Sequence, residues 1–418
     1  MDLGTGASIE HATVLFSMVC AGGSKQWQML ASSGGTRIGV IMRSQLKTHE
    51  FAEIPCNTDL AKGVLVSGGS SVEIRTVACI ESTNIYPSVI ATGGEDGYLR
   101  LCRPPRSDLK ETGLMPLFEA RRHTSAIRCI CISGPYLFTG GGGCELRCWR
   151  YYRDGEFELS DYAVAPSLGD SRVMDVVVIH KDESIGVVIA TAYSDASIRL
   201  WRLDSLNRQL VCVAQDVNST NRHCVLSLNS FSHNTSVNGV HRSTKYVVSG
   251  STSGQLAFWD VTQFLEPNVD LKTKRDLGPP ILLQENVHQS GVNTIAISSH
   301  HDACSVSIAT GGDDGSVAIW EYSAALSDPL STKLKLVARR TDAHASAVQA
   351  VAFLDGHKWV CSLGTDQRLA IWSVNNGHLD LAHMACSQVA DPSAMAILDS
   401  TCRSVVIVGI GIEFINFQ

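Results

Sequence analysis

The chain has 418 residues, of which 44% are apolar and only 18% are charged. Such a composition excludes a wholly disordered chain, because it supplies enough apolar side chains to bury a large core. Lysine and arginine number 34 against 41 aspartates and glutamates, for a net charge of -7. This balance argues against a protein whose whole surface coats nucleic acid.

The N-terminal apolar stretch, residues 13–21, lacks the mark of a secretory signal. Its flank carries Asp2 and Glu10 and no lysine or arginine, whereas a signal peptide begins with a basic segment. No apolar run approaches the roughly 20 residues that cross a bilayer. We therefore expect a cytoplasmic protein without membrane insertion.

The 14 cysteines contain no C-x-x-C pair. The closest group is Cys129, Cys131, Cys144 and Cys148, but these alternate with apolar residues in strand-like runs. They are interpreted as small buried side chains rather than zinc ligands, and so many free thiols favour a reducing compartment. No metal, cofactor or small-molecule substrate is expected.

One short pattern recurs along the chain: an apolar run, a polar Gly/Asp/Ser turn, and an alternating strand that ends in tryptophan. The clearest copies are residues 308–320 and 360–372. Alternation with a period of two on both sides of a turn predicts a β-hairpin. The last residues of successive copies lie 47, 52, 58, 61 and 52 apart, slightly more than the roughly 40–45 residues of a four-stranded WD-type blade.

A histidine precedes several hairpins and is followed four residues later by a β-branched residue, as in His123 before Ile127. With this mark the units resemble WD repeats, in which a histidine, a Ser or Thr, a turn aspartate and a tryptophan form a hydrogen-bonded chain. The resemblance places these structural tetrads at His288, Thr310, Asp314 and Trp320 and at His344, Ser362, Asp366 and Trp372. A hydrolase triad is disfavoured because the set recurs, whereas a nucleophile site is expected once.

Other units depart from the pattern: Gly143 and Ser253 occupy the turn-aspartate position, Cys102 the tryptophan position, and Asp391 falls where a histidine would be. Residues 71–418 accommodate seven such units. We therefore predict an all-β fold, a WD40-type propeller of seven blades with four antiparallel strands each. Three interpretations of residues 1–70 remain: an extra hairpin, strands that close the ring, or the remnant of a preceding propeller.

Arg147, Arg150 and Arg153 alternate with aromatic residues, a composition that can contact phosphates and stack on bases. They are candidate RNA contacts, although arginine is also common at exposed strand positions.

The C-terminal stretch has a more particular appearance. The segments 288–293, 311–315, 344–348, 365–369, 389–392 and 409–413 occur in an order that resembles the last propeller of a WD-repeat family, the non-catalytic partner of the tRNA wobble-nucleotide ribose 2'-O-methyltransferase. The resemblance covers about residues 70–418. It implies a scaffold that binds a FtsJ-like methyltransferase and supports methylation at position 34, with tRNA contacted through the complex. It also implies further propellers upstream, so a C-terminal piece or a truncated gene is expected.

Two other classes of function compete with this hypothesis. A generic WD40 adaptor in ubiquitin-ligase or trafficking complexes is the alternative, although a ligase receptor would resemble Trp-Asp-x-Arg where this chain has Trp259-Asp260-Val261-Thr262. An enzyme in its own right is not expected, because no set of carboxylates or histidines stands outside the repeat pattern.

Overall fold

The computed structural model divides into two compact units, residues 1–56 and 57–418. It describes residues 15–21, 24–30, 64–65, 73–82, 88–104, 114–152, 158–167, 169–182, 185–216, 223–237, 240–266, 273–299, 305–325, 328–354, 358–375, 377–398 and 404–416. The first unit holds an antiparallel hairpin of β1 (Leu15–Ala21) and β2 (Ser24–Leu30), in which Met18 lies opposite Trp27.

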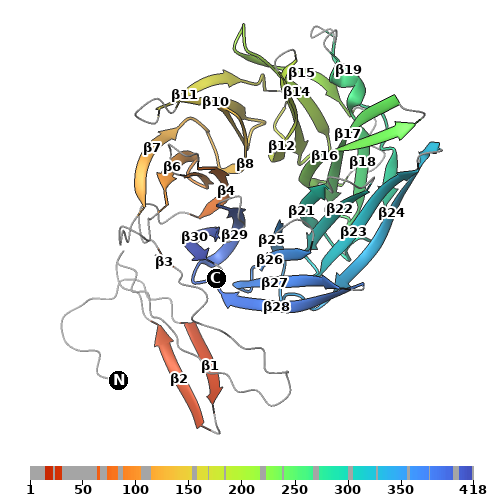
Figure 1. Cartoon of the computed structure of the whole chain (residues 1–418). Helices are drawn as coiled ribbons and strands as arrows, with labels where there is room; N and C mark the ends of the chain where they lie inside the picture. The colour runs from red at the N-terminus through yellow and green to blue at the C-terminus, as the bar shows by residue number, and fades with distance from the viewer. Residues whose placement is uncertain are drawn as a thin grey trace. The chain divides into compact units, whose positions relative to one another are not determined.

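The second unit is a ring of seven sheets, here called blades 1 to 7 (Figure 1). Within each blade, neighbouring strands in sequence pair antiparallel, as hairpin-connected strands do. Blade 1 comprises β4 (Ile74–Ile80), β5 (Val89–Gly94), β6 (Tyr98–Arg103) and β7 (Met115–Arg121). Blade 2 comprises β8 (Ile127–Ser133), β9 (Tyr136–Gly141), β10 (Leu146–Tyr152) and β11 (Glu158–Val164). Blade 3 comprises β12 (Val173–Asp182), β13 (Gly186–Tyr193), β14 (Ile198–Asp204), β15 (Gln209–Gln215) and, parallel to β15, β19 (Arg275–Asp276).

The remaining blades continue around the ring in chain order. Blade 4 comprises β16 (Val225–Val237), β17 (Val240–Ser251), β18 (Leu256–Asp260) and β20 (Leu282–Gln284). Blade 5 comprises β21 (Val292–Ser299), β22 (Ser305–Gly312), β23 (Val317–Ala325) and β24 (Asp328–Arg340). Blade 6 comprises β25 (Val348–Leu354), β26 (Trp359–Gly364), β27 (Arg368–Asn375) and β28 (His378–Cys386). Blade 7 comprises β29 (Ala390–Ile397), β30 (Ser404–Asn416) and β3 (Val64–Leu65).

The predicted all-β architecture of seven antiparallel blades is confirmed. Two blades differ from a plain set of four strands, since blade 3 gains β19 and blade 7 has the long β30 in place of two shorter strands. Among the described residues, the helical structure is a single 3-10 turn, Thr262–Phe264.

The core lies between blades rather than within them. One cluster joins Phe231, Tyr246 and Phe258 of blade 4 to Trp320 and Tyr322 of blade 5, all of them buried. The apolar face of each sheet is removed from water only when it packs against the neighbouring blade. The stability of each blade therefore depends on the next one.

Glycine sets how closely two blades approach. A Cβ atom on Gly311 of blade 5 would lie 2.5 Å from Val348 Cγ1 of blade 6, and one on Gly140 of blade 2 would lie 2.5 Å from Val173 Cγ1 of blade 3. These distances are shorter than any van der Waals contact between carbon atoms. The recurring glycine of the repeat is therefore needed where the neighbouring blade's first strand passes.

The ring is closed in two ways. Ser393 Oγ of β29 donates a hydrogen bond to the carbonyl oxygen of Ile74 in β4, so the last blade is joined directly to the first. In addition, β3 pairs antiparallel with β30, with Val64 opposite Phe414 and Leu65 opposite Glu413. Of the segment 1–70, residues 64–65 thus belong to the closing blade.

Candidate functional site

The His288 side chain in blade 5 is part of a continuous hydrogen-bonded chain. Trp320 Nε1 donates to Thr310 Oγ1 over 3.2 Å, and His288 Nε2 lies 2.9 Å from the same oxygen. His288 Nδ1 lies 3.0 Å from Asp314 Oδ1, whose other oxygen accepts from the backbone N–H of Gln289. Every donor finds an acceptor if Thr310 donates to Nε2 and the Nδ1 proton goes to Asp314.

Blade 6 repeats this arrangement with a serine. Trp372 Nε1 donates to Ser362 Oγ over 2.8 Å, His344 Nε2 lies 2.8 Å from that oxygen, and His344 Nδ1 lies 3.0 Å from Asp366 Oδ1. Both histidine side chains have no exposed surface, and burial lowers the pKa of His288 and His344. These groups brace the blades internally, and no substrate can reach the imidazoles as they stand.

Burial opposes ionisation of Asp314, but hydrogen bonds from the Gln289 N–H and from Ser316 outweigh it and lower the pKa of Asp314 to about 2. The charged carboxylate thus accepts hydrogen bonds from two places in the chain: from Gln289, which follows the repeat histidine, and from Ser316, which lies in the same turn as Asp314.

Blade 2 carries a similar grouping that the sequence pattern concealed, in which the imidazole approaches the carboxylate without a hydrogen bond to it. His123 Nε2 lies 2.7 Å from Thr139 Oγ1, to which Trp149 Nε1 donates over 2.9 Å. The carboxylate comes from Glu145, whose Oε2 lies 3.3 Å from His123 Nδ1 and accepts from the Thr124 N–H. The sequence had assigned the turn-aspartate position to Gly143, but the longer glutamate reaches the same place from two residues further along.

In blade 7 the expectation for Asp391 is wrong. Ser387 takes the histidine position, since its N–H donates to the Gln367 carbonyl as the His344 N–H donates to that of Gly315. Glu413 Oε2 accepts from Ser387 Oγ over 2.6 Å and from the Gln388 N–H over 2.9 Å. Because β30 runs from Ser404 to Asn416 without the turn that carries Asp314 and Asp366 in blades 5 and 6, the carboxylate of blade 7 comes from within this strand.

The candidate RNA contacts are engaged inside the protein where the structure describes them. Arg147 Nη1 lies 3.0 Å from Asp161 Oδ2. The guanidinium of Arg150 lies 4.9 Å from the ring centre of Tyr152 and 5.7 Å from that of Tyr162. Arg153 lies outside the described residues, so the grouping of the three arginines stays a prediction.

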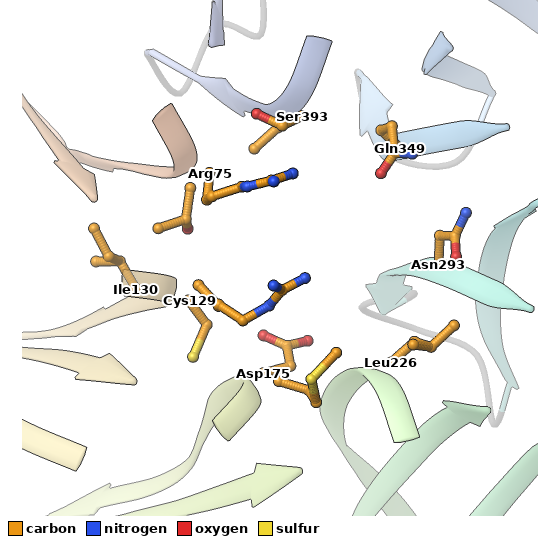
Figure 2. A pocket seen from close by; sticks show the side chains of 12 residues that line it. Arg75, Cys129, Ile130, Asp175, Leu226, Asn293, Gln349 and Ser393 are labelled. Atoms are coloured by element: carbon orange, nitrogen blue, oxygen red, sulfur yellow. The ribbon is translucent and has the colours of Figure 1, made fainter. Parts of the chain in front are cut away.

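A cavity of about 250 Å³ lies where the innermost strands of the blades meet. Its wall takes residues from the innermost strand of every blade: Arg75, Arg128, Met174, Leu226, Asn293, Gln349 and Ser393. Figure 2 shows the labelled side chains converging from separate strands, with the Arg75 guanidinium directed toward the middle. The site therefore exists only in the closed ring.

A shared backbone irregularity directs these side chains to the axis. The pairing register of each innermost strand shifts near its start, between Ile127 and Cys129 in β8 and between Val292 and Thr294 in β21, for example. The skipped residue, Arg128 or Asn293, is the one that lines the cavity. A β-bulge turns a side chain in this way.

The repeat pattern alone does not predict this site, although the sequence carries a signal for it. The cavity residue comes directly after the β-branched residue that follows each repeat histidine by four positions, as Arg128, Asn293 and Gln349 do. Because the residue type changes from blade to blade, no recurring letter marks the position.

Asp175, which follows Met174 in β12, also faces the cavity, as Figure 2 shows for its carboxyl group. Burial raises the pKa of its carboxyl to about 7, although its oxygens accept hydrogen bonds from the N–H groups of Val176 and Leu228. Burial therefore opposes the charged form of this carboxyl.

Within the described ranges, no group of three or more His, Cys, Asp or Glu side chains is arranged to hold a metal ion. In the same ranges, no helix has the length and hydropathy of a membrane span.

Comparison with known proteins agrees with this architecture. The family "WD domain, G-beta repeat" matches residues 115–150, 223–260, 282–321 and 335–373. The crystal structure of Sqt1 from Chaetomium thermophilum superposes with a TM-score of 0.57 over 86% of this chain and 98% of that one, at 14% sequence identity. The last comparison concerns the fold alone.

Curated relatives are similar over part of their length. The tRNA (34-2'-O)-methyltransferase regulators WDR6 of Bos taurus, Pongo abelii and Homo sapiens are 28%, 29% and 28% identical to the chain over 243, 248 and 248 residues. Each match covers 54% of this chain and 21% of the relative, so the chain matches about a fifth of their length. The chain is thus a seven-bladed β-propeller that carries WD40 repeats in four stretches, and over about half of its length it is similar to proteins named tRNA (34-2'-O)-methyltransferase regulators.

Proposed function

We propose that this chain is a non-catalytic WD-repeat scaffold that binds a FtsJ-like methyltransferase and supports 2'-O-ribose methylation of tRNA at position 34. The observation that carries the proposal is the similarity to relatives that are named regulators of this methylation. Catalysis and the methyl donor would then belong to the partner, and the propeller would supply a rigid platform.

The structure supports a scaffold role through the use made of its reactive side chains. The imidazoles of His123, His288 and His344 are fully buried and hydrogen-bonded between strands. Residues that resemble a hydrolytic set are thus committed to bracing the ring. A propeller offers two wide rims for partners, and binding sites on such folds lie on loops held by the rigid blades.

The alternative, a generic adaptor in ubiquitin-ligase or trafficking complexes, has less support. The segment after Trp259 ends in Thr262, whose side chain bonds to Asp260 Oδ1 over 2.6 Å and thus closes a local turn. The relatives above are named for tRNA methylation, and no observation favours a ligase role.

Direct contact with tRNA is a separate part of the proposal. Arg150 has no carboxylate partner among the described ion pairs, so its charge is available to a phosphate although its guanidinium already packs against Tyr152 and Tyr162. Arg147 is less available because Asp161 and Glu145 neutralise it. We expect contact with tRNA to be made by the assembled complex with the methyltransferase. We also expect this complex to act in the cytoplasm.

The proposal is tested by deleting the gene and measuring 2'-O-methylation at position 34 by mass spectrometry of purified tRNA. We expect the modification to fall strongly and to return when the full chain is supplied, while base methylations of the same tRNA stay unchanged. Tagged full chain should retain a FtsJ-like methyltransferase. Unchanged methylation at position 34 in the deletion strain would contradict the proposal.

A further inference from the structure

Arg128 lines the axial cavity and forms no ion pair there, although its charge is near enough to Glu73 to favour the ionised form of that carboxyl. Among the described residues no carboxylate lies within ion-pair distance of its guanidinium. Its neighbour Arg75 is held in place, because Nη1 lies 2.8 Å from Glu73 and Nε lies 2.5 Å from Glu95. Arg75 retains Nη2 for a further acceptor, and Figure 2 shows its guanidinium reaching into the cavity.

The remaining wall of the cavity has an apolar part and a polar part. Met174 and Leu226 supply an apolar side. Gln349 supplies an amide for which the described residues offer no partner, while the Asn293 amide already donates to Asp313. A ligand here would meet guanidinium donors at one side, apolar carbon at another and a free amide at a third.

The acidic groups nearby weaken this positive field less than their number suggests. Glu73 and Glu95 both form ion pairs with Arg75. Burial raises the pKa of Asp175 to about 7, and burial also raises that of Glu73. An anion in the cavity would favour the protonated forms further.

We propose that the axial cavity binds a small phosphorylated ligand, with its phosphoryl oxygens on Arg128 and Arg75. A phosphoryl group suits two guanidiniums from adjacent blades because it offers several oxygens in different directions, whereas one guanidinium satisfies a carboxylate. The organic part lies against Met174 and Leu226 and hydrogen-bonds to Gln349. The volume of about 250 Å³ lies just below the range of roughly 300–1,000 Å³ of small-molecule pockets, which favours a free phosphomonoester over a polymer.

The site is tested by isothermal titration calorimetry on the full chain with adenosine 5'-monophosphate, inorganic phosphate and adenosine. We expect saturable binding of the nucleotide, weaker binding of phosphate and no binding of adenosine. Arg128→Gln should weaken nucleotide binding at least tenfold. Arg275→Gln, which removes the same charge from an exposed residue of β19, should leave it unchanged.

Gln349→Ala should weaken binding of the nucleotide but not of inorganic phosphate. Thermal unfolding of each variant shows whether it folds. Should Arg128→Gln be unfolded, competition on the wild type replaces it: sulfate must displace the nucleotide, and sodium chloride at equal ionic strength must not. Equal binding of adenosine and its monophosphate, or no saturable binding of either phosphate compound, would overturn the proposal. Because methylation is not measured, failure here leaves the proposed function untouched.

Discussion

Glu413 Oε2 accepts a hydrogen bond from Ser387 Oγ over 2.6 Å, so β30 is tied to the segment that enters the same blade. The Glu413 side chain is 2% exposed and also accepts from the Gln388 N–H. This carboxylate does for blade 7 what Asp314 and Asp366 do for blades 5 and 6, without a histidine between.

Replacing Glu413 by alanine should therefore be costly. Glu413→Ala leaves the Ser387 O–H and the Gln388 N–H without their acceptor in the interior, and we expect a loss of about 2–4 kcal/mol in the free energy of unfolding. Glu413→Gln keeps an acceptor of the same size and should lose less than half of that. Urea unfolding followed by tryptophan fluorescence gives both values, and equal losses would contradict the assigned role.

The His344 and Asp366 side chains should behave as one energetic unit. Because His344 Nδ1 and Asp366 Oδ1 lie 3.0 Å apart in a buried chain, the double change His344→Ala with Asp366→Ala should destabilise by less than the sum of the single changes. We expect a coupling of about 0.5–3 kcal/mol, the range for residues in one network. Strict additivity in denaturant unfolding would show that they do not interact.

Mild acid should weaken the ring through His123. Burial lowers the pKa of this imidazole from 6.5 to about 4, so between these pH values the unfolded chain takes up a proton that the folded chain refuses. Stability therefore falls as the pH drops from 6.5 to 4, by up to about 3 kcal/mol from this residue.

Urea unfolding at several pH values measures the slope of stability against pH. His123→Gln should be less stable at pH 7 but show a smaller slope in this window, whereas His378→Gln, which changes an exposed histidine, should keep the wild-type slope. An unchanged slope in His123→Gln would count against the buried neutral imidazole. The carboxyl of Asp314, with its pKa near 2, contributes only in stronger acid.

The contact of Gly311 with Val348 should limit what blade 5 tolerates. Gly311→Ala places a methyl group 2.5 Å from Val348 Cγ1 and should destabilise by about 1–3 kcal/mol through overpacking. Adding Val348→Ala removes the nearest atom, while Val348 Cβ and Thr294 Cγ2 still lie 2.9 Å from the new methyl group, so the double variant should lose less than the sum of the two single changes but not regain the wild-type stability. Thermal unfolding of the four proteins completes the cycle, and a sum without coupling would mean that the blades move apart instead.

Most of the fold was predictable from the sequence, because a propeller repeats one local unit. The period-two alternation and the polar turns of residues 308–320 and 360–372 depend on near neighbours in the chain. The groupings around His288 and His344 also follow from spacing within one repeat. Blades 2 and 7 departed from this rule, since Glu145 and Ser387 reach the expected places from unexpected positions.

The axial cavity and the closure of the ring were decided by tertiary structure. Arg75 and Gln349 are separated by most of the chain and meet at one cavity only because seven blades complete a circle. The bulge that turns each side chain inward is a property of strand pairing, and the pairing of Val64 with Phe414 joins opposite ends of the unit. The alternation of apolar and polar residues decides which face of a strand is buried. Which residues meet at the central cavity depends instead on how the seven blades pack and close into a ring.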